Sequence, residues 1–141
     1  MLSFDLLRFV RGGFGGHGGR IGIEYHDHGT DWCELALPWR EDLTGDDRTG
    51  AMAAGPVVSL LDVAASLAVW HRRGHFVPHA TLDLRLDHLR APRANEGVIG
   101  RGECYRIEES VSFVRGIAHE GDPDDPIAHL VGTYMVTGAR P

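Results

Sequence analysis

The sequence predicts an α+β fold in which a curved antiparallel sheet wraps around one long central helix. The first observation is a run of 23 residues between Arg48 and Arg72 that carries one formal charge, Asp62. The second is a set of segments in which apolar and polar residues alternate, as is typical of strands. The third is the shortness of the links between the later segments, because short links join antiparallel neighbours. A helix that is apolar on nearly every side fits best inside such a sheet.

The composition is that of a single soluble domain. The 141 residues are 43% hydrophobic and 24% charged, which suffices for one sizeable core. The net charge of −6 gives no support for a nucleic-acid surface. All 14 basic residues are Arg, and the lack of Lys excludes a Schiff-base lysine and a Walker-type phosphate loop. Cys33 and Cys104 fall in strand-like segments, where we expect small buried residues rather than a disulfide.

Residues 1–20 are expected to form a short helix and a glycine-rich linker before a single domain over residues 21–141. The helix is expected from Ser3 to Val10, with Ser3 as its cap. Six glycines within residues 12–19 indicate a mobile connector, which we expect to be dispensable for activity. One G-x-G-x-x-G match lies there, but no strand-like segment precedes it, so a linker is favoured over a dinucleotide-binding loop.

No segment of the chain has the features of a targeting or membrane sequence. Charges near the N-terminus interrupt the apolar stretch that a signal peptide requires. A membrane span needs about 20 uninterrupted apolar residues, and the longest run is shorter and contains Asp62. We therefore expect a cytoplasmic protein with no membrane partner.

The apolar run around Asp62 predicts a core helix of about 15 residues, within the usual length of globular helices. Gly55-Pro56 opens the helix, because proline is favoured in the first turn. The sequence His71-Arg72-Arg73-Gly74 ends it. The polar members of the run, Ser59, Asp62 and Ser66, form one narrow stripe at helical spacing.

Strand segments flank this helix on both sides. Leu82, Leu84 and Leu86 alternate with polar residues and should face one side of the sheet. The alternation slips by one at residues 88–90, as expected at a bulge. A loop is expected over residues 40–54. The other strands are expected at residues 21–26, 32–37, 97–107, 111–119 and 127–137.

Asp62 is the best candidate for a functional residue. An ionised carboxylate is costly to bury without a partner, so its place in an apolar helix indicates catalysis or substrate contact. The alternative is a structural acid that is satisfied by an arginine. Other site chemistries have less support: there is no Gly-x-Ser-x-Gly motif for a catalytic triad. His71, His75 and His79 have helical spacing, but Gly74 and Pro78 interrupt it, so no metal is expected.

From Ile21 to Gly138 the chain resembles the hotdog-fold acyl-CoA thioesterases of the PaaI-like, phenylacetate-pathway group. The resemblance rests on a glycine-bearing loop that opens the helix and an acid seven residues after Gly55. It also rests on Leu86-Asp87-His88-Leu89-Arg90-Ala91-Pro92, which is similar to the family pattern V-x-F-L-R-P.

The resemblance implies roles for residues of the helix. In that family an Asp or Glu in the middle of the helix is catalytic, and Asp62 occupies this position. Ser66, one turn later, falls where relatives often carry Ser or Thr. The family helix usually opens with His-Gly-Gly, where this chain has Ala53-Ala54-Gly55, so the histidine is absent.

Thioester hydrolysis needs hydrogen-bond donors where the carbonyl oxygen becomes negative, and the first turn of a helix has free N–H groups. Here these are the amides of Ala54 and Gly55, because Pro56 has none. Asp62 would act as general base or as nucleophile. Ala54 and Asp62 are eight residues apart, about 12 Å along a helix, which is too far for one helix to supply both groups. This predicts a homodimer with composite sites, and the resemblance implies the same arrangement, often as dimers of dimers.

Coenzyme A carries phosphates, for which arginine is well suited. Arg90 and Arg93 flank Pro92 where such relatives place nucleotide contacts, and Ser59 is a further candidate for substrate contact. No cofactor is expected beyond the coenzyme A thioester as substrate. Three functions therefore stand: a thioesterase for acyl-CoA or aroyl-CoA, a hydratase or dehydratase on the same fold, and a non-catalytic acyl-CoA-binding module. The hydratase usually needs a His paired with the acid, and the helix has none beside Asp62.

Overall fold

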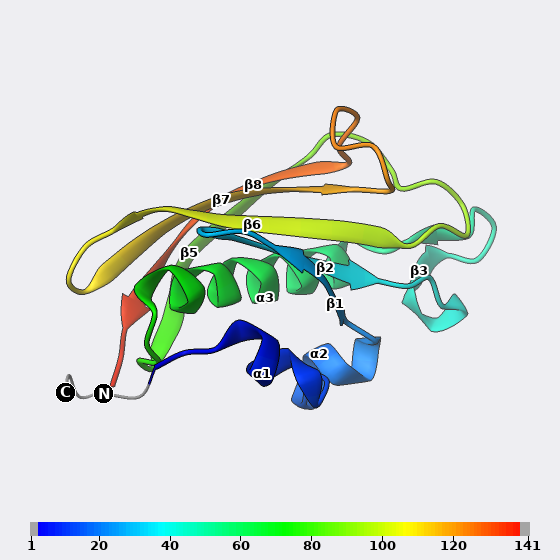
Figure 1. Ribbon diagram of the computed structural model, residues 1–141. Helices are drawn as coiled ribbons and strands as arrows, with labels where there is room; N and C mark the ends of the chain where they lie inside the picture. Colours follow the sequence, from blue (N-terminus) through cyan, green and yellow to red (C-terminus); the bar gives the residue numbers. More distant parts are fainter. Residues whose placement is uncertain (1–2, 139–141) are drawn as a thin grey trace.

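The computed structural model describes residues 3–138, which form a curved six-stranded sheet around one long helix (Figure 1). Residues 1–2 of the predicted N-terminal segment and residues 139–141 of the predicted domain lie outside the described residues. All neighbouring strands are antiparallel, in the order β1-β2-β6-β7-β8-β5. The predicted fold class is therefore confirmed. The strands are β1 (Glu24–His28), β2 (Trp32–Leu37), β5 (His79–His88), β6 (Val98–Ile107), β7 (Val111–His119) and β8 (Ala128–Val136).

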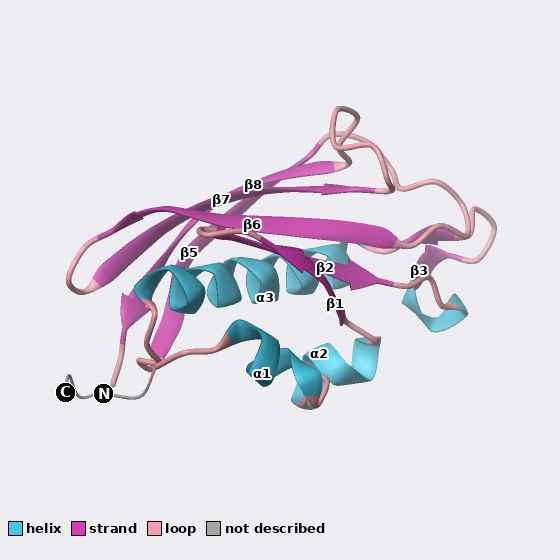
Figure 2. Ribbon diagram, in the orientation of Figure 1, coloured by secondary structure: helices cyan, strands magenta, loops and turns pink. Residues whose placement is uncertain are grey.

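The central helix α3 (Ala54–Arg73) has 20 residues and begins two residues before Pro56, so it is longer than predicted. Ala53 precedes it with extended backbone, and no side chain caps the first turn. The helix ends at Gly74, whose φ of 75° places it in the left-handed region that favours glycine. Length and composition alone would let α3 cross a membrane. Here the sheet covers one face of α3 (Figure 2), and eight of its residues are buried.

The sheet approaches α3 closely because β6 carries glycines at the contact. A Cβ atom added at Gly100 would lie 2.8 Å from Cγ of Leu60, closer than such atoms normally pack. At Gly102 the added atom would meet the backbone of Ala65. Since Ala64 and Ala65 are fully buried, small residues on both elements allow the helix to sit against the sheet. Cys33 and Cys104 are free thiols buried in this core, as predicted.

The predicted strands match the observed ones closely, except at β1 and within β5. β1 begins at Glu24 because Ile21 belongs to a helix. The bulge predicted at residues 88–90 is wrong: β5 ends at His88, and the register shifts between Thr81 and Asp83. The shift explains why Leu82 is 57% exposed while Leu84 and Leu86 pack against the core.

The predicted loop before α3 contains short regular elements. A 3-10 helix, η1 (Glu41–Leu43), leads into a small hairpin of β3 (Thr44–Asp46) and β4 (Ala51–Met52). The amide of Ala53 donates to the carbonyl of Leu43 at 2.8 Å. This bond directs the chain into the first turn of α3.

The N-terminal segment lies on the face of α3 opposite the sheet (Figure 2). It contains α1 (Leu6–Arg11) and α2 (Gly16–Ile21). Asp5, and not Ser3, caps α1: its Oδ1 accepts from the amide of Arg8 at 3.1 Å. The stretch predicted as a mobile connector thus holds a helix, α2. Phe14 and Ile21 pack against the core, so tertiary contacts outweigh the low helix propensity of glycine.

Candidate active site

Asp62 lies near the middle of α3 and faces a pocket of about 360 Å³. This Asp62 pocket lies between α3, β5 and the N-terminal segment. Asp62 and its neighbours Ser59, Val63 and Ser66 are half-buried, so the expectation of a helix buried nearly all round is wrong on this side. The sheet covers this face of α3 only in part, through residues of β5 and β8 that line the pocket. The pocket is lined by Phe9, Gly13, Phe14, Gly15, Asp62, Val63, Ser66, Leu67, Trp70, His79, Ala80, Thr81 and Tyr134.

Two hydroxyl groups hold one oxygen of the Asp62 carboxylate. Thr81 donates from Oγ1 to Oδ1 at 2.8 Å, and the Tyr134 hydroxyl donates to the same Oδ1 at 2.7 Å. The Tyr134 hydroxyl also lies 2.8 Å from the backbone oxygen of Asp62. Among residues 3–138, no arginine pairs with Asp62 and no hydrogen bond reaches Oδ2. The carboxylate is therefore oriented on one oxygen and free on the other.

The register of two strands brings these hydroxyl groups together. Thr81 of β5 and Tyr134 of β8 are directly paired in the sheet. Tyr134 is only 2% exposed, and burial together with the Asp62 charge raises the pKa of its phenol. Tyr134 consequently remains a protonated donor toward Asp62 across the physiological pH range.

Ser66 and His79 form a second polar pair in the same pocket. Ser66 follows Asp62 by one helical turn, and its Oγ lies 2.5 Å from Nε2 of His79. The His79 ring stacks on Trp70 with centroids 4.5 Å apart. Burial, with a smaller effect of Arg73, lowers the pKa of His79 to about 4, although the Asp62 charge opposes this shift. His79 is therefore neutral at pH 7, and its buried Nδ1 has no hydrogen-bond partner.

Three polar residues of this pocket were not predicted as site residues from the sequence: His79, Thr81 and Tyr134. The spacing of His71 and His79 does not reflect a shared helix, because His71 lies in α3 and His79 in β5. His71 instead packs against His28. Within residues 3–138, no group of three or more His, Cys, Asp or Glu residues could hold a metal ion. Thr81 and Tyr134 lie in correctly predicted strands, but nothing in either strand alone indicates that they pair.

The predicted oxyanion donors lie in the first turn of α3, at its N-terminal end. Ala54 and Gly55 are exposed, and no side chain caps their amides. A Cβ atom added at Gly55 would meet nothing within 4 Å, so a ligand could approach its backbone. Ala54 lines a second pocket of about 320 Å³, together with residues 88–92. Within one protomer, Asp62 and Ala54 thus line different pockets.

Ser59 does not reach the Asp62 pocket. Its Oγ lies 2.9 Å from Nε2 of His17, so it ties α3 to α2. The prediction that Ser59 contacts substrate therefore gains no support from its position, which faces the N-terminal segment.

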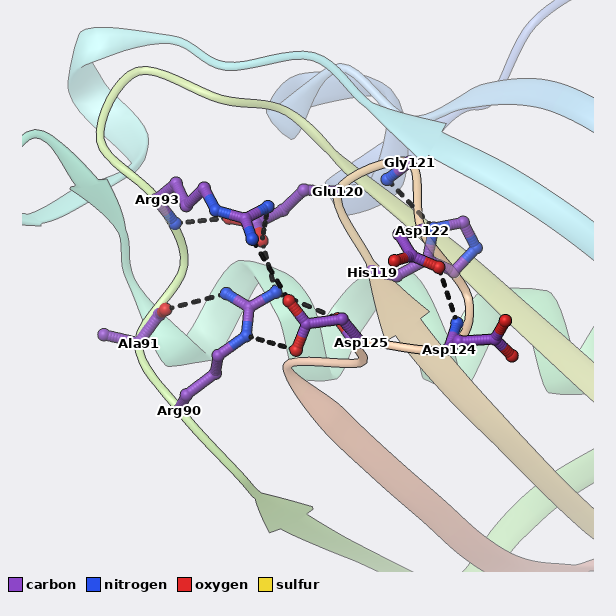
Figure 3. Close-up of polar contacts among 9 residues, drawn as sticks. All are labelled: Arg90, Ala91, Arg93, His119, Glu120, Gly121, Asp122, Asp124 and Asp125. Carbon is purple, nitrogen blue, oxygen red and sulfur yellow. Dashed lines mark hydrogen bonds and ion pairs between the residues drawn. The ribbon is translucent and has the colours of Figure 1, made fainter.

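Arg90 and Arg93 are held in an ion-pair network (Figure 3). The Glu120 side chain is fully buried and pairs with Arg90 at 2.7 Å and Arg93 at 3.4 Å, while also accepting from the amide of Arg93. Asp125 pairs with the same guanidinium groups at 3.2 and 3.1 Å. Both arginines thus join the loop after β5 to the β7–β8 turn. Arg90 also lines the second pocket, while the predicted phosphate contacts stay a prediction.

The curved sheet around α3, with an acid in the middle of the helix, defines a hotdog-fold protein. The model of the thioesterase superfamily matches residues 49–127, and the chain belongs to this family. The resemblance to PaaI-like hotdog thioesterases that the sequence indicated is confirmed.

Solved structures agree with this assignment. A Pseudomonas aeruginosa protein is 30% identical, with a TM-score of 0.78 and 94% of each chain covered. A thioesterase from Haemophilus influenzae is 21% identical, with a TM-score of 0.80 over 97% of this chain and 95% of that one. The Escherichia coli PaaI protein from the phenylacetic acid degradation operon is 12% identical, with a TM-score of 0.74 over 86% and 83%. No curated protein matches the chain.

Proposed function

We propose that the protein hydrolyses an acyl-CoA or aroyl-CoA thioester and that Asp62 supplies the catalytic carboxylate, as general base or as nucleophile. One observation carries this proposal: the Asp62 carboxylate lies in a pocket with Oδ1 held by two hydroxyl groups and Oδ2 free. A carboxylate that is oriented but not neutralised can accept a proton or attack a carbonyl carbon. Membership of the thioesterase superfamily supports the proposal that the bond to be broken is a thioester.

Two routes use this carboxylate. As a general base, Oδ2 takes a proton from a water molecule whose oxygen attacks the thioester carbonyl carbon. The tetrahedral intermediate then collapses, the C–S bond breaks, and the thiolate of coenzyme A leaves with that proton. As a nucleophile, Asp62 attacks the carbonyl carbon itself and expels the thiolate, and water then hydrolyses the mixed anhydride. Both routes yield a carboxylic acid and free coenzyme A.

The negative oxygen of the intermediate would be bound by the amides of Ala54 and Gly55 of a second protomer. These amides have no capping side chain, and Ala54 lines a different pocket from Asp62 of its own chain. An antiparallel partner helix would bring its first turn to Asp62. The proposal therefore includes a homodimer with two equivalent composite sites.

The test is release of free thiol from a panel of acyl-CoA thioesters, detected with a chromogenic thiol reagent. We expect Asp62→Asn to lower kcat by at least about a hundredfold, as for loss of a general base, and to leave the oligomeric state unchanged. Asp83→Asn is the matched control, because Asp83 is an exposed carboxylate on β5. Hydrolysis by Asp62→Asn at the parent rate would show that Asp62 is structural.

A hydratase is the second candidate, because the structure places His79 in the Asp62 pocket. Such an enzyme would add water to an enoyl-CoA and release no thiol. Loss of the enoyl-CoA absorbance without thiol release would favour the hydratase. Binding of acyl-CoA with neither reaction would identify a non-catalytic module. The observation that favours this alternative is Ala53, which stands where the family usually has a histidine.

A further inference from the structure

The N-terminal segment closes one side of the Asp62 pocket. Phe9 of α1 and Phe14, with Gly13 and Gly15 beside it, line the pocket opposite the residues from α3 and β5. These residues precede the part of the chain that the superfamily model matches. The pocket is thus built partly by a segment that the catalytic proposal does not use.

Several contacts attach this segment to α3. The amide of Phe4 donates to the carbonyl of Gly74 at 3.0 Å, and Leu6 is only 2% exposed. Phe9 lies 6.1 Å from Trp70 between ring centroids. The His17–Ser59 pair, at 2.9 Å, joins α2 to the first half of α3. Because both helices are docked, the segment limits the size of the pocket.

The lining of the pocket has a polar part and an apolar part. Asp62, Ser66 and Thr81 form the polar part, while Phe14, Leu67 and Trp70 belong to the apolar part. A thioester has the same division, with a polar carbonyl group and an apolar acyl chain. The N-terminal residues that line the pocket bear no charge, so they favour an uncharged acyl group. The volume of about 360 Å³ is near the lower end for ligand pockets.

We infer that the N-terminal segment sets the acyl specificity: Phe14 closes the acyl end of the pocket, so that short uncharged acyl groups bind and long chains are excluded. This inference rests on the proposed function, because it takes the acyl group to enter beside Asp62. It replaces the sequence-based expectation that residues 1–20 are dispensable for activity.

The test compares Phe14→Ala, which lengthens the pocket, with Phe14→Trp, which shortens it. Binding is measured by calorimetry with S-alkyl-CoA thioethers from ethyl to tetradecyl, which cannot be hydrolysed. Each methylene group that enters an apolar pocket increases the affinity about threefold to fourfold, until the alkyl chain reaches the closed end of the pocket. We expect the preferred chain to be short in the parent, longer in Phe14→Ala and shorter in Phe14→Trp.

Leu7→Ala is the matched control, because Leu7 is an exposed apolar residue of α1 outside the pocket. It should retain the parental chain-length profile. Opposite shifts at one position cannot result from loss of stability, since both variants would then change in the same direction. Cooperative thermal unfolding of each variant checks that it is folded.

The outcomes separate this inference from the proposed function. If hydrolysis depends on Asp62 but the parent and both Phe14 variants have the same chain-length profile, the inference is wrong and the proposed function stands. Shifted thioether profiles without hydrolysis of any thioester would overturn the proposed function and support the pocket. Failure of every thioether to bind the parent would overturn the inference.

Discussion

At the scale of single residues, the Tyr134 and Thr81 hydroxyl groups determine how the Asp62 carboxylate is held. Both donate to Oδ1, at 2.7 and 2.8 Å. Such bonds fix the orientation of the carboxylate. The proposed reaction therefore depends on two residues that need not touch the substrate.

Tyr134→Phe should reduce turnover while keeping the fold. The variant retains the buried ring and loses only the donor to Asp62, so we expect kcat to fall about tenfold and the free energy of unfolding to fall by about 1 kcal/mol. Steady-state kinetics and denaturant unfolding measure the two effects. Tyr105→Phe is the control, since Tyr105 is 42% exposed and outside the pocket. Equal kcat values for Tyr134→Phe and the parent would contradict the role of Tyr134.

His79 should make the protein less stable in acid. Its pKa is lowered to about 4 in the folded chain, below the ordinary value of 6.5, mainly by burial. Between these two values the unfolded chain binds more protons, so stability from this group is present above pH 6.5 and is lost as the pH falls toward 4. The free energy of unfolding of His79→Gln should decline less over this interval than that of the parent. Parallel curves for the two proteins would show that His79 does not contribute.

At the scale of elements, an ion-pair network joins the loop after β5 to the β7–β8 turn. Glu120 is the centre of this network, because its buried carboxylate pairs with both Arg90 and Arg93. The same loop, residues 88–92, lines the pocket beside the first turn of α3. The network thus positions the backbone around the proposed oxyanion donors.

Glu120→Gln should destabilise the protein by about 2 kcal/mol, the usual value for a hydrogen bond to a charged group. The amide keeps the shape of the side chain but cannot pair with two guanidinium groups. Asp87→Asn is the control: its pair with Arg85 is exposed, at 53% and 70%, and should contribute less than about 1 kcal/mol. Denaturant unfolding compares the two variants. Equal losses of unfolding free energy in the two variants would mean that the buried ion pairs of Glu120 contribute no more than the exposed pair of Asp87.

At the scale of the whole molecule, the proposed mechanism needs a second protomer, because the acid and the amides are separated within one chain. Asp62 and Ala54 line different pockets of one chain. β5 is an edge strand of the sheet, and most of its residues are exposed. The protomer by itself therefore presents half of each site proposed here.

Mixing two inactive variants tests the composite site directly. Asp62→Asn lacks the acid, and Gly55→Pro lacks one amide in a first turn that tolerates proline. In a mixed dimer, one site combines the intact Asp62 of one chain with the intact Gly55 of the other. We expect thiol release to recover to about a quarter of the parental rate after subunit exchange, because half of the dimers then have one intact site of two. Absence of recovery in dimers shown to be mixed would place the whole site within one protomer.

The sequence by itself determined the central helix, most strand positions and the choice of Asp62. These features are local, because hydrophobic periodicity and a lone acid in an apolar run are visible within single segments. The prediction that the amides of Ala54 and Gly55 are the oxyanion donors is also local, because it depends on Pro56, which has no N–H group, in the first turn.

Only the tertiary structure decided which residues surround Asp62. The partnership of Thr81 with Tyr134 depends on the register of β5 on β8, and His79 reaches Ser66 because β5 passes beside α3. The ion pairs of Arg90 and Arg93, and the docking of Phe14, likewise join distant segments. Such contacts are set by the packing of the whole chain, since strand register and helix docking minimise exposed apolar surface globally and leave no pattern within any single segment.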